Sequence, residues 1–133
     1  MSSTASPPSA AKGSRAYGFV EWFRPGEYER TLEVLPHIKA GGASYLRTHL
    51  SWAEYLAPGG EEWFDWMIPT VGKEIDLLLC VHYTPPSISR TGRSSGPPVD
   101  LKSYADFVDH VITRYGQYFT HIELWNEPNN LLD

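Results

Sequence analysis

Short apolar runs alternate with longer segments of helical period from Ala16 onward. Such alternation is typical of βα units, in which parallel strands are covered by helices. The run DLLLCV is apolar at successive positions, as expected for a strand that is covered on both faces. The pattern predicts four strands, at 16–20, 44–50, 76–81 and 120–125.

A helix with a clear apolar stripe is predicted before the fourth strand. Apolar residues recur there at three- and four-residue steps from Leu101 to Phe119, which places one stripe against a sheet. Asp100 is suited to cap the start of this helix, and Gly116 is suited to its end.

Two further helices are predicted, at about 26–40 and 61–74. Each contains a proline, Pro36 in the first and Pro69 in the second. A proline inside a helix removes a backbone hydrogen bond and crowds the preceding turn. We therefore expect both helices to be kinked or split.

This alternating order of strands and helices is compatible with an open doubly wound sheet or with part of an eight-stranded (β/α) barrel. No G-x-G-x-x-G or G-x-x-x-x-G-K-[ST] turn follows a predicted strand, which argues against the nucleotide-binding open sheets. The long loop PPSISRTGRSSGPP follows the third strand. Barrel enzymes keep their sites on such loops at the carboxyl ends of the strands, so the loop favours a partial barrel.

The composition is that of one globular domain. The chain has 133 residues, of which 41% are hydrophobic and 20% charged. The formal net charge is -5 and the basic residues are scattered, which argues against a nucleic acid partner. No apolar run is long enough to cross a bilayer, so we expect no membrane partner.

The first fifteen residues, MSSTASPPSAAKGSR, lack the apolar core of a secretory signal. Their Ser, Ala and Pro content predicts a disordered tail over 1–15, followed by one partial barrel domain over 16–133. The lack of a signal favours the cytoplasm. The single cysteine, Cys80, lies in an apolar run and is interpreted as a small buried hydrophobic residue.

Polar and aromatic side chains gather at the predicted strand ends, where parallel strands open on one face. They are Glu21, Arg47, His49, Trp52, His82, Tyr83, Asn126 and Glu127. A carboxyl, an imidazole, a guanidinium and an indole around one mouth can hydrogen-bond to and stack on a polyhydroxylated ring. Their spacing is not that of a metal site, and we expect neither a metal nor a cofactor.

The motif ELWNEP ends the fourth strand, and YLRTHLSW and VHYTPPS lie on the second and third. This set resembles the glycoside hydrolases built on the (β/α)8 barrel, the clan whose acid/base is the Glu of an Asn-Glu-Pro motif. The β-xylosidase-like and family 5 cellulase-like members are the most similar. The resemblance extends from Tyr17 to Pro128 and implies the N-terminal half of a TIM barrel, about four βα units.

The resemblance also implies roles for particular residues. Glu127 would be the general acid/base, which protonates the leaving glycosidic oxygen and later deprotonates water. Asn126 would hydrogen-bond the sugar 2-hydroxyl, and Arg47 would orient the nucleophile or hold it ionised. His82 would bind a sugar hydroxyl or lie near the nucleophile, and Trp52 would be a stacking platform.

Each of these residues also has a purely structural interpretation. Glu127 can be a solvated loop carboxylate, and Arg47 and His82 can satisfy backbone carbonyls. Trp52, Trp63 and Trp66 are residues of a type found more often in the core than on a ligand platform, and Trp63 and Trp66 are assigned to the core. Glu21 and Glu123 are interpreted as structural polar residues, and His37, His110 and His121 as surface residues.

The nucleophile implied by the resemblance is a Glu at the end of a seventh strand, and no residue of this chain matches it. Three hypotheses follow: a retaining glycosidase or its N-terminal half, a sugar-binding module without hydrolysis, and an inactive remnant. A half-barrel exposes two strand edges. We therefore expect a complementary half-barrel or self-association, besides a carbohydrate substrate, unless the chain relaxes into an open sheet.

Overall fold

The computed structural model describes residues 16–129. Its strands are β1 (Gly18–Val20), β2 (Tyr45–Ser51), β3 (Asp76–His82) and β4 (His121–Leu124). Its helices are α1 (Tyr28–Ala40), α2 (Trp52–Tyr55), α3 (Gly60–Gly72) and α4 (Leu101–Tyr115), with a 3-10 turn, η1 (Pro86–Ile88). The predicted tail at 1–15 lies outside the described residues, as does the segment 130–133.

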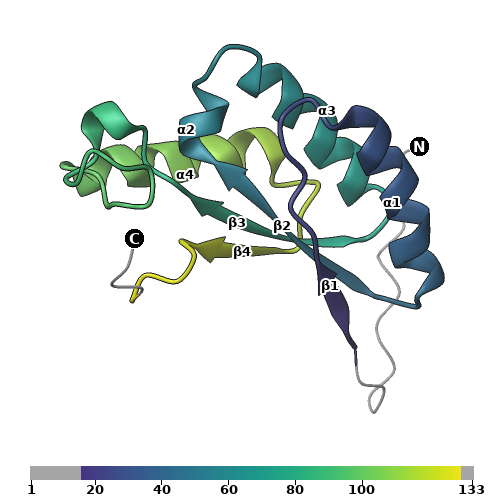
Figure 1. The fold of residues 1–133 in the computed structure, drawn as a ribbon. Helices are drawn as coiled ribbons and strands as arrows, with labels where there is room; N and C mark the ends of the chain where they lie inside the picture. The colour runs from purple at the N-terminus through teal and green to yellow at the C-terminus, as the bar shows by residue number, and fades with distance from the viewer. Residues whose placement is uncertain (1–15, 130–133) are drawn as a thin grey trace, which may run out of the picture.

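The four strands form one parallel sheet in the order β1-β2-β3-β4 (Figure 1). Strands that follow one another in the chain are therefore neighbours in the sheet, joined by crossover helices. This arrangement confirms the predicted α/β class and the four predicted strands. The outer edges of β1 and β4 are unpaired among residues 16–129.

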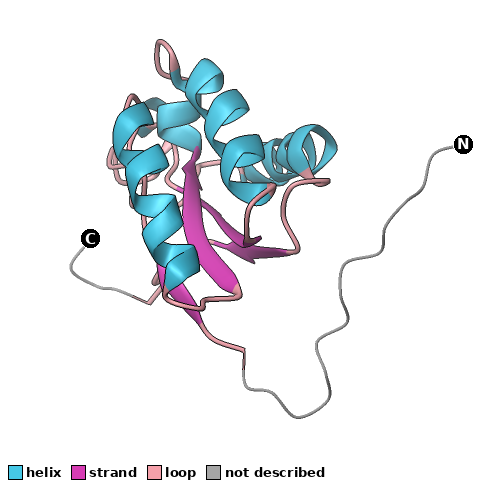
Figure 2. Ribbon diagram, turned by 90° about the vertical axis from the view of Figure 1, so that its right-hand side faces the viewer, coloured by secondary structure: helices cyan, strands magenta, loops and turns pink. Residues whose placement is uncertain are grey.

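The helices lie on one face of the sheet, and the core forms between the two layers (Figures 1 and 2). Leu46, Leu77 and Leu79 point into it from the strands and are fully buried. The predicted stripe of the last helix is confirmed, because Phe107 and Val111 of α4 are buried in the same core. Burial of each such side chain contributes about 1.5–3 kcal/mol.

The opposite face of the sheet is only partly covered. Strand register places Val20, Arg47, Leu78 and His121 in one row across the four strands. These four residues contribute to the lining of an open groove of about 400 Å³. This partly covered face carries Arg47, Glu123 and the two buried histidines, His49 and His82.

The prolines do not split their helices. Both α1 and α3 run continuously through Pro36 and Pro69. Pro36 lies on the exposed side of α1, as does Leu32, whose carbonyl loses its helical partner there. Water can reach such a carbonyl, which lowers the cost of the missing hydrogen bond. Of the two predicted outcomes, a kink or a split, the split is wrong for both helices.

The short helix α2 was not predicted from the apolar pattern. It begins directly after β2, where the Ser51 hydroxyl accepts a hydrogen bond from the Glu54 backbone N–H at 3.1 Å. This cap satisfies an orphan donor of the first turn. The turn carries Trp52 away from the mouth of the sheet, which matters for the role predicted for that residue.

Candidate functional site

A two-point polar contact on the face of the sheet opposite the helices joins β2 to β4. Arg47 donates from Nε to Glu123 Oε2 at 2.6 Å and from Nη2 to Oε1 at 3.0 Å. The Arg47 hydrogen bond lowers the pKa of the Glu123 carboxyl below its usual range, and the same contact raises the pKa of Arg47. A two-point pair of this kind fixes the plane of the guanidinium.

The same guanidinium orients the neighbouring amide. Arg47 Nη2 also donates to Asn126 Oδ1 at 2.9 Å. Because the amide oxygen is turned toward Arg47, the Asn126 N–H groups are directed elsewhere and have no acceptor among the described residues. Asn126 therefore presents hydrogen-bond donors to a ligand at the mouth of the sheet.

Glu127 follows on an unusual stretch of backbone. It has φ 46°, and Trp125, two residues before it, has φ 75°. Tyr83, at the end of the neighbouring strand, has φ 61°. Left-handed conformations are costly for residues with a side chain, and they gather at functional sites where the surrounding structure enforces them. The backbone N–H of Trp125 donates to the Val81 carbonyl at 2.9 Å and holds this turn against β3.

These three residues surround a pocket of about 260 Å³. Its lining consists of Tyr83, Thr91, Ser95, Gly96, Pro97, Trp125, Asn126, Glu127 and Pro128. The pocket thus joins the end of β4 to the long loop between β3 and α4. It offers a carboxylate, an amide, three hydroxyls and two aromatic rings, groups that can hydrogen-bond to and stack on a polar ligand.

A buried aromatic cluster lies beside the arginine. His49 Nδ1 and His82 Nε2 are 3.0 Å apart, and His49 Nε2 is 3.3 Å from the Phe23 carbonyl oxygen. The Trp22 ring stacks on His49 with centroids 4.6 Å apart. Burial lowers the pKa of His49 to about 4 and that of His82 to about 3, with the nearby Arg47 charge adding to both effects.

The contacts assign the protons of the neutral pair. A carbonyl only accepts, so His49 Nε2 carries the hydrogen that points to Phe23. Its Nδ1 then accepts from His82 Nε2–H, which leaves His82 Nδ1 as a bare acceptor. That atom is buried and has no hydrogen-bond partner among the described residues. The hydrogen bond between His82 and His49 therefore links the side chains of β3 and β2 near the ends of these strands.

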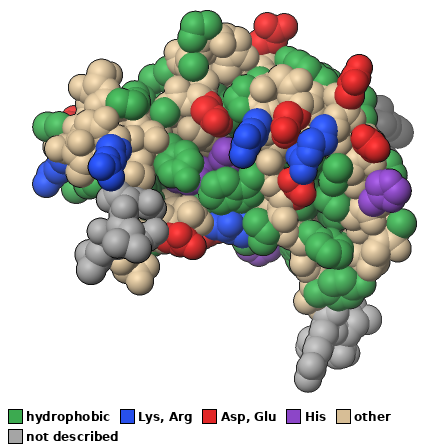
Figure 3. Space-filling model, in the orientation of Figure 1, with side chains coloured by type: hydrophobic (Ala, Val, Ile, Leu, Met, Phe, Trp, Pro, Cys, Tyr) green, Lys and Arg blue, Asp and Glu red, His purple; other side chains and the backbone are tan. Residues whose placement is uncertain are grey.

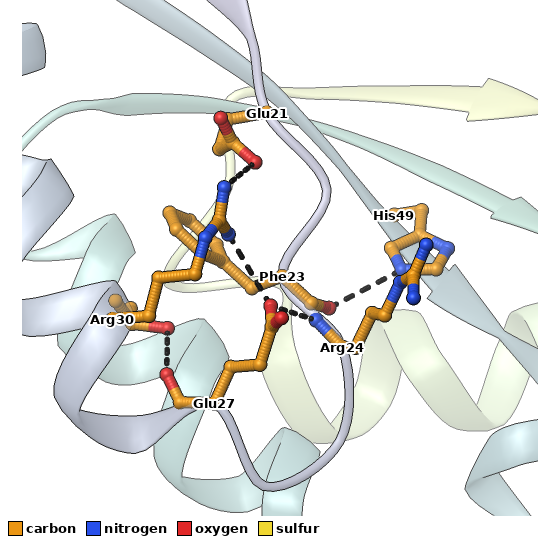
Figure 4. Close-up of polar contacts among 7 residues, drawn as sticks. Glu21, Phe23, Arg24, Glu27, Arg30 and His49 are labelled. Atoms are coloured by element: carbon orange, nitrogen blue, oxygen red, sulfur yellow. Dashed lines mark hydrogen bonds and ion pairs between the residues drawn. The ribbon is translucent and has the colours of Figure 1, made fainter.

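The loop after β1 is tied down by a second charged network (Figure 4). Arg30 of α1 donates to Glu21 at 2.7 Å and to Glu27 at 3.2 Å. Glu27 also accepts from the backbone N–H of Arg24 at 2.9 Å. The structural interpretation of Glu21 agrees with these contacts, because its carboxylate pairs with an arginine of the helix that follows.

The structure brings three of the five predicted site residues together. Arg47 and Asn126 are in contact, and Glu127 follows directly in the same pocket wall. His82 is adjacent in the sheet but fully buried, so in this arrangement it does not present a nitrogen to a ligand in the pocket.

Trp52 lies in the core. Its side chain is 5% exposed and stacks on Phe107 of α4 with centroids 5.2 Å apart. A buried indole has no exposed face on which a sugar ring can stack. The expected platform role is therefore not supported, and Trp125 and Tyr83 are the aromatic residues that line the pocket.

The interpretation of Glu123 as a structural polar residue agrees with its ion pair to Arg47, but sequence reasoning did not predict that partner. Glu123 alternates with Ile122 and Leu124 on a short strand, so it shares the sheet face on which Arg47 lies. A carboxylate that is partly buried on a sheet is stabilised by a nearby cation. The presence of Glu123 between two apolar residues was therefore the one sequence feature that indicated a basic partner. Trp22 had no such signal, because its contact with His49 depends on how the β1 loop folds back.

Within residues 16–129, no three side chains of the His, Cys, Asp and Glu types are arranged to hold a metal ion. No helix in the same range combines the length and apolar character needed to cross a membrane.

Comparison with known proteins identifies no family for this chain. The sequence matches no protein-family model, and no curated protein matches it. The glycosidase resemblance thus stays a prediction that rests on the residues and on the geometry of their site.

Proposed function

We propose that this chain carries the acid/base half of a retaining O-glycosyl hydrolase site. The observation that supports this best is the hydrogen bond from Arg47 to Asn126, next to Glu127 in the pocket wall. It turns the Asn126 amide so that its N–H groups can donate to a sugar oxygen while Glu127 faces the same space. A donor to the sugar 2-hydroxyl beside an acid/base carboxyl is what the oxocarbenium-like transition state requires.

In this proposal Glu127 protonates the leaving glycosidic oxygen. After the leaving group departs, the carboxylate takes a proton from the water that attacks the glycosyl intermediate. Trp125 and Tyr83 are the candidate surfaces for the sugar ring. Glu123 acts through Arg47 and is a positioning residue rather than a catalytic one.

The retaining mechanism also needs a nucleophile about 5–5.5 Å from the acid/base. Among the described residues, Glu127 is the only carboxylate in the pocket lining. We propose that the second carboxyl comes from further parallel strands that pair with the open edges of β1 and β4 and complete a (β/α)8 barrel. Such strands would belong to a longer parent chain or to a second polypeptide that forms the complementary half-barrel.

The single carboxylate favours one alternative, a carbohydrate-binding module that does not hydrolyse its ligand. The pocket, the oriented amide and the aromatic walls suffice for binding, whereas hydrolysis needs the missing group. The two functions therefore share a site and differ in turnover.

The deciding experiment measures hydrolysis of 4-nitrophenyl β-xyloside and β-glucoside together with calorimetric titration of the parent sugars. If the chain is hydrolytic, Glu127→Gln should lower kcat by about 10²–10⁴-fold. The matched control, Glu29→Gln on the exposed face of α1, should not change it. Sugar binding without turnover is the result expected of the binding module and also of an acid/base half tested without its nucleophile. Hydrolysis that Glu127→Gln leaves unchanged contradicts the site, and a chain that neither binds nor hydrolyses sugars contradicts both functions.

A further inference from the structure

Trp125 follows β4 and forms part of the pocket wall, and strand β3 holds its backbone at two points. The Trp125 N–H donates to the Val81 carbonyl at 2.9 Å, and the Cys80 thiol donates to the Trp125 carbonyl at 3.4 Å. The residue has φ 75°, a left-handed conformation that is costly for a residue with a side chain. The two contacts with β3 therefore keep Trp125 in a conformation that it would rarely adopt by itself.

Tyr104 of α4 contacts Trp125 at the same place. Its hydroxyl donates to the Val81 carbonyl at 2.7 Å, so that one carbonyl accepts from both residues. A carbonyl oxygen has two lone pairs and can accept both hydrogen bonds. The Tyr104 ring meets the Trp125 indole at an angle of 75°, with centroids 5.6 Å apart, which is a favourable edge-to-face arrangement. Tyr104 thus touches the indole and shares its backbone anchor.

The position of Tyr104 is set by the helix layer and not by the pocket. Its ring is partly buried against the hydrophobic core. Burial raises the pKa of Tyr104 to about 12, so the hydroxyl keeps its proton at neutral pH and remains a donor. Tyr104 is not among the residues that line the pocket. Its contact with Trp125 is therefore what connects it to the pocket wall.

Charged side chains do not single out one region of the surface seen in Figure 3. Acidic side chains lie beside basic ones there, with hydrophobic side chains between them. Within the pocket, the Trp125 indole is the largest apolar group. Aromatic faces are the surfaces on which sugar rings stack. The orientation of this indole therefore determines much of the stacking area that the pocket offers.

We propose that Tyr104 is a positioning residue for the pocket: its hydroxyl and ring hold the Trp125 indole in the orientation in which a sugar ring stacks on it. The inference rests on the proposed function, because it assumes that a sugar occupies the pocket. A side chain that is ordered before the ligand arrives loses less conformational entropy on binding. Tyr104 therefore raises the affinity for the sugar without touching it.

The test measures binding of methyl β-xyloside and methyl β-glucoside to the full chain by calorimetric titration. Tyr104→Phe removes the hydroxyl and keeps the ring, and it should weaken binding by about two- to tenfold, the range expected for one side chain ordered in advance. Tyr115→Phe is the matched control, because it lies in the same helix and loses a hydroxyl that donates to Asp65 at 2.7 Å. This control should leave the affinity unchanged. Equal losses in the two variants would assign the effect to the stability of the helix and overturn the inference.

A double variant tests whether Tyr104 acts through Trp125. In the Trp125→Ala background, Tyr104→Phe should have no further effect on affinity, because the indole that it positions is gone. A further loss of affinity in that background would show that Tyr104 affects the pocket by another route, and the inference would fail.

The indole N–H signal of Trp125 in NMR spectra tests the positioning without any sugar. Its loss in Trp125→Ala identifies the signal. The signal should be broadened or displaced in Tyr104→Phe and unchanged in Tyr115→Phe. Because phenylalanine keeps a ring beside the indole, such a change reports movement of the indole itself.

An unchanged signal in Tyr104→Phe overturns the inference whether or not a sugar binds. Absence of sugar binding by the wild-type chain contradicts the proposed function. In that case the NMR comparison still decides whether Tyr104 orients Trp125, so the two failures are distinguishable.

Discussion

Arg47 of β2 and Glu123 of β4 form a two-point ion pair across the uncovered face of the sheet, at 2.6 and 3.0 Å. Strand β3 lies between them in the sheet order. The pair therefore ties two non-adjacent strands together and at the same time holds the Asn126 amide in place. Stability and site geometry depend on the same guanidinium.

Loss of either partner should destabilise the protein by leaving the other charge half-buried. We expect Arg47→Met to lower the free energy of unfolding by about 1–2 kcal/mol, measured by urea denaturation. The double variant Arg47→Met/Glu123→Leu should cost less than the sum of the single variants. Lys102→Met, at the exposed pair with Asp106, is the control and should change stability by less than about 0.5 kcal/mol. Additive single effects would show that the ion pair is not coupled.

The buried histidine pair should make stability fall in mild acid. The pKa values of His49 and His82 are lowered to about 4 and about 3 by burial, whereas unfolded histidine titrates near about 6.5. Below that pH the unfolded chain binds protons that the folded chain does not. The free energy of unfolding should therefore decrease as pH falls from about 6.5 toward 4, by up to about 1.4 kcal/mol per pH unit for each histidine.

Urea denaturation at several pH values measures this slope. His82→Gln should reduce it, because one of the two buried imidazoles is gone. His37→Gln, on the exposed face of α1, should leave the slope as it is. A slope that neither substitution alters would assign the acid sensitivity to other groups.

The left-handed backbone at Glu127 should cost stability in exchange for the position of its carboxyl. Glu127 has φ 46°, a region that glycine enters without strain. We expect Glu127→Gly to raise the free energy of unfolding by about 0.5–1 kcal/mol, whereas Glu127→Gln should leave it nearly unchanged. Both variants should lose any hydrolytic activity. A less stable Gly variant would mean that the Glu127 side chain itself stabilises the turn.

Trp52 should matter for folding and not for ligand binding. Because its ring is buried against Phe107, Trp52→Ala should lower the free energy of unfolding by about 3–5 kcal/mol. The variant that remains folded at low temperature should bind sugar with unchanged affinity. By contrast, Trp125→Ala should weaken binding, since Trp125 lines the pocket. Reversed results would restore Trp52 as the stacking platform.

The open edge at β1 gives the clearest test of self-association. Val20 at this edge is 63% exposed, and Val99, in the loop before α4, is exposed to the same extent. If a second copy or another half-barrel pairs with β1, Val20→Lys should shift the oligomer toward monomer in sedimentation experiments. Val99→Lys should not. A wild-type chain that is monomeric at high concentration would exclude self-association through this edge.

The sequence by itself determined the local structure of this protein. Apolar periodicity identified the four strands and the three longer helices between them. The spacing of buried side chains differs between a helix and a strand and depends only on which face of the element is buried. The periodicity also placed Asn126 and Glu127 after the fourth strand and Arg47 within the second, since it fixes where each strand lies along the chain. The Asn-Glu-Pro tripeptide indicated a candidate acid/base only together with its place after the fourth strand and the family resemblance that this arrangement supports.

Only the tertiary structure decided which side chains meet. Glu123 reaches Arg47 across an intervening strand, and His49 contacts both Trp22 and His82, through registers that no local pattern specifies. The short helix after β2 turned Trp52 into the core and removed it from the mouth. Burial and contacts depend on how distant segments of the chain pack together. Residues at similar positions along their strands can therefore end up in the core or in the pocket.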